Sequence, residues 1–298
     1  MIIPPFLSPG DQVGISATAK KVDQKYLSEG IEILNSWGLN VKTGINVLKE
    51  ETFFAGNEDE RASDLQDFIS NPGIKAIFCA RGGYGTGRIL DKINFSPLLS
   101  SPKWIIGFSD ITILHLKLNQ LGLASLHGPM PAIFHKTTEN AIESVRQFLF
   151  GGGLKPLFAK YNKENRMGKT SGKAIGGNLS MICHSLGTSL EIDTNNKILI
   201  LEEVDEPLYK IDRMMHQLGK AGKFEKLRAL VMGCFTIPEK ESNSFDYSLH
   251  EIISYHVRSY NYPIASGFSF GHEPENYPIP LSVQINIDIG SQGSTISY

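Results

Sequence analysis

The sequence predicts an α/β protein whose first half is a doubly wound, mostly parallel sheet and whose second half is a smaller, strand-rich α+β domain. Three observations carry this expectation. Apolar runs of strand length alternate with segments of helical period through the first half. A glycine-, lysine- and asparagine-rich stretch then shows no sustained period. Beyond it, long irregular stretches separate the strand candidates. The predicted domains are therefore 1–155 and 173–298, joined by a linker at 156–172.

The strand candidates of the first half are apolar enough to be covered on both faces, as in a parallel sheet. They lie at Gln12–Ala17, Asn40–Thr43, Lys75–Ala80 and Trp104–Phe108. Helical apolar spacing occupies the segments between and after them, at Tyr26–Trp37, Glu58–Ser70 and Ala141–Phe150. This alternation predicts a flavodoxin-like arrangement. In the second half we expect strands at Lys197–Leu201, Ala229–Phe235 and Val283–Ile289, and one strong helix at Lys210–Leu218.

Composition excludes several classes of function. The chain has 29 basic and 31 acidic residues, so no excess positive charge is available for nucleic acid. It has neither a secretory leader nor about 18 consecutive apolar residues, so we expect a soluble cytoplasmic protein without a membrane partner. Cys79, Cys183 and Cys234 lie far apart and two interrupt apolar runs, which indicates reduced, buried thiols. We expect no metal and no cofactor, and a thiol nucleophile is a minor alternative.

Ser109 is the candidate nucleophile. It follows the apolar strand ending in Gly107-Phe108 and precedes a helix with Ile111 and Leu114 on its apolar face. At such a strand-to-helix turn a hydroxyl is held exposed, and the next backbone N–H, that of Asp110, is directed at a developing oxyanion. The alternative is a helix N-cap, which serine also favours. The hydrolase elbow pattern asks for glycine where this chain has Ile111.

Four glycines within six positions follow the strand at Lys75–Ala80, in the segment Arg81–Arg88. Such a loop indicates positive φ angles or close approach of a ligand to the backbone. As a phosphate cradle it is incomplete, because Arg88 stands where the third glycine of the dinucleotide motif is required. The other interpretations are an oxyanion-hole amide near Gly83 and a plain tight turn. Arg81 is a candidate for holding a substrate carboxylate, with a surface salt bridge as its alternative, and Tyr84 is a second substrate-binding candidate.

His272 is the candidate general base, because it lies in a proline-rich irregular loop, where functional side chains concentrate. His127 is its main rival, since it too is expected in a loop after a strand, whereas His115 and His216 fall in helical runs. A carboxylate at the end of the strand Lys197–Leu201 is suited to accept the histidine's Nδ1 proton. The acids there are Glu202, Glu203, Asp205 and Glu206.

Taken together, these segments resemble the LD-carboxypeptidase family of serine peptidases, which includes murein tetrapeptide carboxypeptidases and microcin C immunity peptidases. The resemblance spans nearly the whole chain and rests on several motifs in order: Gly10-Asp11, Phe54-Ala55-Gly56 with Arg61, Arg81-Gly82-Gly83-Tyr84-Gly85, Gly107-Phe108-Ser109-Asp110, His127-Gly128-Pro129, Gly176-Gly177-Asn178-Leu179-Ser180, Leu201-Glu202-Glu203, Tyr209-Lys210-Ile211-Asp212-Arg213 and Gly271-His272.

The resemblance implies a triad of Ser109, His272 and Glu202, with oxyanion donors from the amides of Gly83 and Asp110. It also implies an active site between the two domains, a homodimer, and cleavage of the amide between an L-centre and a terminal D-amino acid. The expected partner is a small murein peptide.

Two features bear on the choice of substrate. The linker lacks a long aromatic insertion of the kind expected for gripping a nucleotide-linked antibiotic, which favours the murein branch over the microcin C branch. The segment Ser16–Lys20 lacks the proline-containing turn common in the family. Outside enzymes, the alternative is a flavodoxin-like module that binds phosphate or nucleotide through Gly82–Gly87. A cysteine amidotransferase is disfavoured because no Gly-x-Cys-x-Gly occurs.

Overall fold

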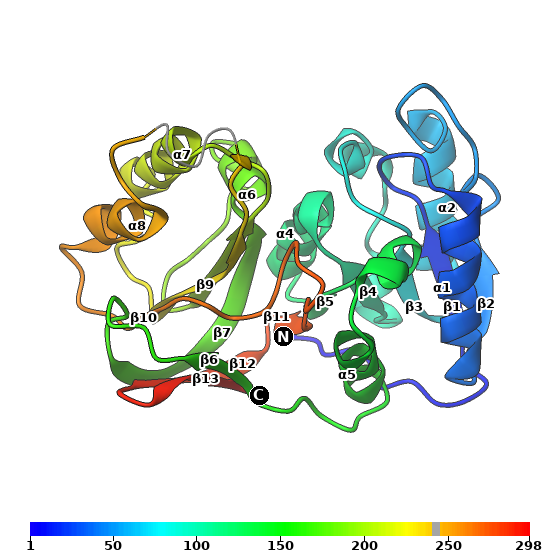
Figure 1. Ribbon diagram of the computed structural model, residues 1–298. Helices are drawn as coiled ribbons and strands as arrows, with labels where there is room; N and C mark the ends of the chain where they lie inside the picture. The colour runs from blue at the N-terminus through cyan, green and yellow to red at the C-terminus, as the bar shows by residue number, and fades with distance from the viewer. Residues whose placement is uncertain (240–244) are drawn as a thin grey trace. The chain divides into compact units, whose positions relative to one another are not determined.

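A computed structural model describes residues 1–239 and 245–298. The chain divides into two compact units (Figure 1). The first unit comprises Met1–Leu154 together with Pro274–Ser282, and the second comprises Lys155–Glu273 together with Val283–Tyr298. The short segment Pro274–Ser282 therefore leaves the second unit, contributes to the first, and returns.

A six-stranded sheet forms the centre of the first unit. Its order is β2-β1-β3-β4-β5-β11, with β1 to β5 parallel and β11 antiparallel to β5. This 2-1-3-4-5 order is the flavodoxin-like one, as predicted. The strands are β1 (Gln12–Ser16), β2 (Asn40–Thr43), β3 (Ile74–Cys79), β4 (Trp104–Gly107), β5 (Ser125–His127) and β11 (Ile279–Leu281).

Side chains cap the starts of three α-helices of this unit, α1, α2 and α5. Asp23 caps α1, and Asn57 and Glu60 form a reciprocal capping box on α2. The α-helices are α1 (Gln24–Ser36), α2 (Glu58–Ser70), α3 (Pro97–Ser100), α4 (Thr112–Gln120) and α5 (Glu139–Leu149). Four 3-10 turns join them, η1 (Thr86–Arg88), η2 (Leu90–Lys92), η3 (Ser109–Ile111) and η4 (Pro131–Lys136).

The core of the first unit lies on both faces of its sheet. Every residue of β4 is buried, which explains the unbroken apolar run in its sequence. Helix α2 packs closely on β1, because a Cβ at Gly14 would lie 2.7 Å from the ring of Phe68. The carboxyl ends of β1, β3 and β4 therefore rest on a rigid, packed layer.

A mixed seven-stranded sheet forms the second unit, in the order β10-β9-β8-β7-β12-β13-β6. Strands β7 to β10 are parallel, and β12, β13 and β6 add antiparallel pairs. The strands are β6 (Leu157–Lys160), β7 (Gly168–Asn178), β8 (Ile198–Glu203), β9 (Ala229–Phe235), β10 (Ile264–Ala265), β12 (Gln284–Gly290) and β13 (Gly293–Ser297). The helices are α6 (Leu179–Ser185), α7 (Leu208–Lys220) and α8 (Leu249–Val257). The strand-rich α+β expectation is confirmed.

The segment 156–172, expected to be an irregular linker, contains strand near both of its ends. It contains β6 and the start of β7, which pair with β13 and β12. Both pieces are partly exposed, with burial that alternates rather than forming an apolar run. Their pairing partners lie more than 100 residues away in sequence, so local periodicity does not reveal them.

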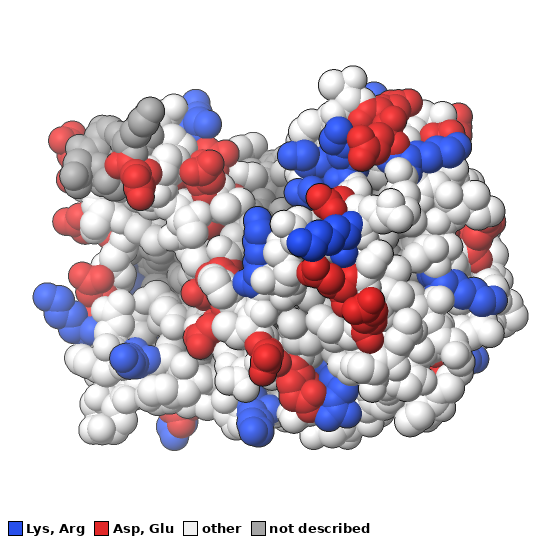
Figure 2. Space-filling model, turned by 45° about the vertical axis from the view of Figure 1, so that its right-hand side comes forward, with Lys and Arg blue, Asp and Glu red and all other residues white. Residues whose placement is uncertain are grey.

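On the face shown in Figure 2, acidic and basic side chains are interspersed and neither sign gathers into a broad patch. In the described part of the chain, no helix combines the length and the apolar character required to cross a membrane.

Candidate active site

Ser109 occupies a strained turn directly after β4. Its φ is 65°, and only three other non-glycine residues have a positive φ within 1–239 and 245–298. The chain passes from the buried strand through Phe108 to Ser109, then into η3 and α4. A serine held in this unfavourable conformation at a strand-to-helix turn is the geometry of a nucleophile elbow.

The N-cap interpretation of Ser109 is wrong. The residues that flank η3 and α4 at their starts are Phe108 and Ile111, and neither helix has a side-chain capping hydrogen bond. Helix capping therefore does not explain the positive φ of Ser109.

The glycine loop after β3 lies against this serine. A Cβ at Gly82 would be 3.0 Å from the Cβ of Ser109 and 3.2 Å from its Oγ, so a larger residue would crowd the hydroxyl. Gly83 has a φ of 121°. The backbone N–H of Thr86 donates to the buried Asp110 carboxylate at 2.8 Å. Asp110 thus fixes the loop to the elbow, a role that the sequence did not suggest for its side chain.

Arg81 and Tyr84 flank these glycines. The guanidinium of Arg81 donates to the Lys21 carbonyl at 3.2 Å, and its Nε has no acceptor among the described residues. No carboxylate of the described residues pairs with it, so the salt-bridge alternative is not supported. Burial lowers the pKa of Arg81. Tyr84 is 47% exposed and contacts the rings of Phe53 and Phe54.

In the second unit, Glu202 and His272 form a hydrogen-bonded pair. The histidine Nδ1 and the Glu202 Oε2 are 2.6 Å apart, with the glutamate fully buried and the histidine side chain 18% exposed. Glu202 lies near the carboxyl end of β8, and His272 lies in the loop that precedes Pro274. A buried carboxylate on Nδ1 fixes the orientation of the ring and stabilises the imidazolium.

Gly271 makes this pairing sterically feasible. Its φ is 107°, and a Cβ there would lie 2.8 Å from both the Cβ and the Oε2 of Glu202. Only glycine tolerates this conformation and this approach without displacement of its neighbours. The requirement for glycine before the histidine is thus explained by contact with the carboxylate.

The neighbouring acid Glu203 has different hydrogen-bond partners. Its carboxylate accepts from the Asn178 side chain at 2.8 Å and from the backbone N–H of Ser180 and Val204 at 2.7 and 2.9 Å. Burial raises the pKa of Glu203, and these hydrogen bonds oppose that rise. Glu203 therefore anchors the start of α6, which leaves Glu202 as the acid that orients the histidine.

Three other histidines are poor candidates for a base. His127 is the last residue of β5 rather than part of a loop, and its side chain is fully buried. His115 bonds Ser125 and the Gly107 carbonyl, and burial lowers its pKa to about 4. His216 is exposed on α7.

A cysteine nucleophile is also disfavoured. Burial raises the pKa of Cys79 and Cys183 to about 12 and that of Cys234 to about 11, so the thiolate is scarce near neutrality.

The candidate residues thus form two groups. In the first unit the structure brings together Ser109 and Asp110 with the loop that carries Arg81, Gly83 and Tyr84. In the second unit it brings together Glu202 and His272. Sequence reasoning missed the steric roles of Gly82 and Gly271, although their glycine identity was the available signal.

Comparisons with known proteins show the family of the chain. Family models for the LD-carboxypeptidase N-terminal and C-terminal domains match residues 13–128 and 171–287. A probable murein peptide carboxypeptidase of Bacillus subtilis (strain 168) is 34% identical, over 98% of this chain and 93% of the relative. Microcin C7 self-immunity protein MccF of Escherichia coli is 24% identical, over 98% and 94%.

A solved structure resembles the whole chain. It is a muramoyltetrapeptide carboxypeptidase from Oxalobacter formigenes, with a TM-score of 0.86 and 26% identity, and the match covers 96% of this chain and 97% of that one. Because the two family models match in order and the Bacillus subtilis relative aligns along nearly its whole length, the protein belongs to the LD-carboxypeptidase family and is a peptidase.

Proposed function

We propose that the protein is a serine LD-carboxypeptidase that removes a terminal D-amino acid from a murein tetrapeptide. The observation that carries the proposal is the 2.6 Å hydrogen bond between the buried Glu202 and His272, because it prepares an imidazole for general base catalysis. The relatives named for murein peptides support the choice of substrate.

In the proposed mechanism, the hydroxyl of Ser109 attacks the carbonyl carbon of the scissile amide while Nε2 of His272 takes its proton. The resulting imidazolium is stabilised by Glu202 and then protonates the departing D-amino acid nitrogen, which leaves an acyl-enzyme. A water molecule, deprotonated by the same imidazole, hydrolyses the ester, and the proton returns to Ser109.

The proposed oxyanion donors are the backbone N–H groups of Gly83 and Asp110. Two contacts support this pairing, namely the packing of Gly82 on Ser109 and the hydrogen bond from Thr86 to the Asp110 carboxylate. They hold the loop and the elbow in one arrangement before substrate arrives, which is the condition for strong electrostatic stabilisation.

Chain connectivity supports a shared role for the two groups of residues. His272 stands two residues before Pro274, a separation of at most about 7 Å along the chain. The Pro274 carbonyl accepts from Thr138 at the start of α5, and the same segment continues into β11 beside β5. The chain therefore enters the first unit two residues after the histidine.

We further propose that Arg81 binds the free carboxylate of the substrate and that Tyr84 contacts the peptide beside it. The Nε of Arg81 needs an acceptor, and a carboxylate supplies one. A carboxylate anchor next to the oxyanion loop accounts for exopeptidase specificity, since a peptide that continues past the scissile residue lacks that charge.

The test is product analysis on a defined murein tetrapeptide. The wild-type protein is expected to release D-alanine, and Ser109→Ala is expected to lose that activity while circular dichroism shows an unchanged fold. Release that persists in the folded variant would remove Ser109 from the mechanism.

The second candidate substrate is an aminoacyl-nucleotide antibiotic of the microcin C type, which the likeness to MccF favours. Assaying both substrates with one preparation separates the two. We also propose a cytoplasmic homodimer, to be checked by cell fractionation and by light scattering of the purified protein.

A further inference from the structure

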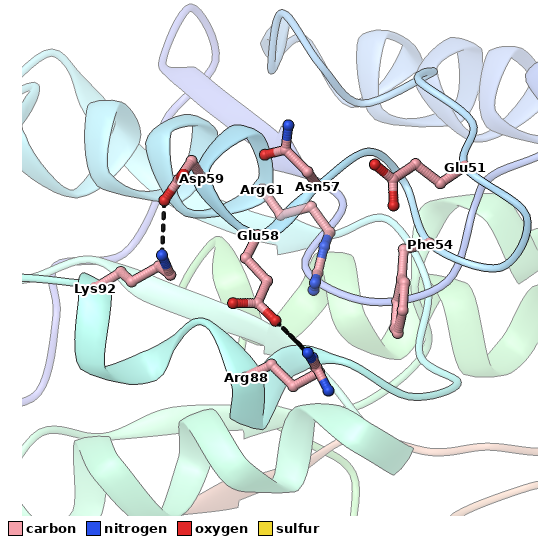
Figure 3. A pocket seen from close by; sticks show the side chains of 8 residues that line it. All are labelled: Glu51, Phe54, Asn57, Glu58, Asp59, Arg61, Arg88 and Lys92. Carbon is pink, nitrogen blue, oxygen red and sulfur yellow. Dashed lines mark hydrogen bonds and ion pairs between the residues drawn. The ribbon is translucent and has the colours of Figure 1, made fainter.

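A pocket of about 330 Å³ lies in the first unit, lined by residues that the mechanism above does not use. It is formed by the first turns of α2, by the segment preceding α2, and by η1 and η2 (Figure 3). The lining residues are Glu51, Phe54, Asn57, Glu58, Asp59, Arg61, Arg88 and Lys92. Its volume is at the lower end of the range for ligand pockets, so it suits a small molecule.

Arg61 supplies unused hydrogen-bond donors to this pocket. Its side chain is 1% exposed, and its Nε donates to the Gly56 carbonyl. Its Nη1 donates to the carbonyls of Thr18 and Gly85, at 2.6 and 2.9 Å. A guanidinium has five N–H groups, and these bonds use three of them. The two on Nη2 have no acceptor within the described residues.

The direction of this side chain is visible in Figure 3, where the guanidinium of Arg61 points toward the middle of the pocket between Glu58 and Phe54. The Phe54 ring lies 4.8 Å from the guanidinium carbon and covers one of its faces. A buried cation whose donors are incompletely used, and which borders an open volume, is poised to bind an acceptor.

The charges around the pocket are balanced, with three acids and three bases. Arg88 pairs with Glu58 at 2.6 Å and Lys92 pairs with Asp59 at 2.7 Å. Two charges remain without an ion-pair partner among the described residues, the cation of Arg61 and the carboxylate of Glu51. A simple anion would be repelled by the acids and a simple cation by the bases, whereas a molecule with both charges close together satisfies both sides.

We propose that this pocket binds a free α-amino acid, with its carboxylate on Nη2 of Arg61 and its ammonium group at Glu51. The proposal rests on the proposed function in one respect, because that reaction releases a molecule of this class. It also has a consequence for the glycine loop. Arg61 holds the Gly85 carbonyl, so a ligand on the same guanidinium is coupled to the loop that packs on Ser109.

The experiment is a calorimetric titration of the full-length Ser109→Ala protein with D-alanine, which measures binding without turnover. Acetate and ethylamine serve as probes that carry one charge each. We expect saturable binding of D-alanine, and dissociation constants at least about tenfold higher for the two single-charge probes.

Glu51→Gln is expected to raise the dissociation constant of D-alanine by about tenfold. The matched control is Glu50→Gln. Glu50 is the neighbouring carboxylate, which pairs with Lys21 and lies outside the pocket. This control is expected to leave the dissociation constant unchanged.

The proposal is overturned if D-alanine shows no saturable binding. It is also overturned if the Ser109→Ala protein binds D-alanine with the same affinity with and without the Glu51→Gln substitution, because the ligand would then bind elsewhere. These outcomes are independent of peptidase activity. If the wild-type protein released no D-alanine from a tetrapeptide but the titration behaved as expected, the proposed function would be wrong and amino-acid binding in the pocket would still be supported.

Discussion

Replacing Gly271 by alanine is expected to separate Glu202 from His272. A Cβ at this position would lie 2.8 Å from both the Cβ and the Oε2 of Glu202, whereas favourable contacts between carbon atoms are about 3.5–4.0 Å long. The loop or the carboxylate must therefore move by about 1 Å. Glu202 is fully buried at the end of β8, so the loop that carries His272 is the part expected to move.

The magnitudes follow from this displacement. A misplacement of about 1 Å at a catalytic group costs about 100-fold in rate, so kcat/KM should fall by about that factor. For stability, an L-residue with φ near 107° costs about 1–2 kcal/mol and overpacking about 1–3 kcal/mol. The free energy of unfolding should therefore fall by about 2–5 kcal/mol.

Gly267→Ala is the matched control, because Gly267 also has a positive φ, of 87°, but a Cβ there would meet only the Ala159 Cβ, at 3.9 Å. This variant should lose about 1–2 kcal/mol of stability and keep its activity. Both are measured by urea denaturation and by D-alanine release. If Gly271→Ala retained kcat/KM within about threefold of wild type, contact with Glu202 would not be the reason for the glycine.

Three further predictions test the other assignments. His272→Ala should reduce kcat by about a thousandfold or more, whereas His127→Ala should chiefly reduce stability, and the opposite result in tetrapeptide assays would exchange their roles. Arg81→Gln should raise KM for the tetrapeptide by about tenfold or more while changing kcat less, and an unchanged KM would exclude Arg81 as the carboxylate anchor. Because burial lowers the pKa of His115 from 6.5 to about 4, the unfolded chain binds the proton first as the pH falls. The free energy of unfolding should therefore fall by about 3 kcal/mol as the pH is lowered from 6.5 to about 4. In His115→Gln the free energy of unfolding should depend less on pH over that interval.

Elements with strong local signals could be predicted from the sequence. The bounds of α2 and β9 agree with expectation residue by residue, since α2 has a capping box and β9 an apolar run. The bounds of β2 also agree, but this strand is mostly exposed, so the expectation that it is covered on both faces is wrong. Helix α8 was missed although it has a capping box at Ser248 and Glu251. Strands β6 and β7 were missed for a different reason, because they depend on partners at the other end of the chain.

In the candidate site, too, some residues could be predicted from local sequence and others could not. The elbow at Ser109 follows from a local pattern of strand, glycine and helix, which the sequence displays directly. The choice of Glu202 over Glu203 does not, because both are buried acids at the end of one strand and differ only in their partners. One bonds His272 and the other bonds the start of α6.

The segment around His272 explains why its role depends on structure that the sequence hides. Phe270, two residues before the histidine, accepts from the Cys234 N–H at the end of β9. Pro274, two residues after it, accepts from Thr138 in the first unit. A loop fixed by backbone hydrogen bonds on both sides of one residue leaves that residue few conformations, so little entropy is lost when the imidazole is oriented. The irregular, proline-rich composition that indicated a functional loop therefore encodes a short segment held by backbone hydrogen bonds, and these bonds, together with Glu202, orient the proposed base.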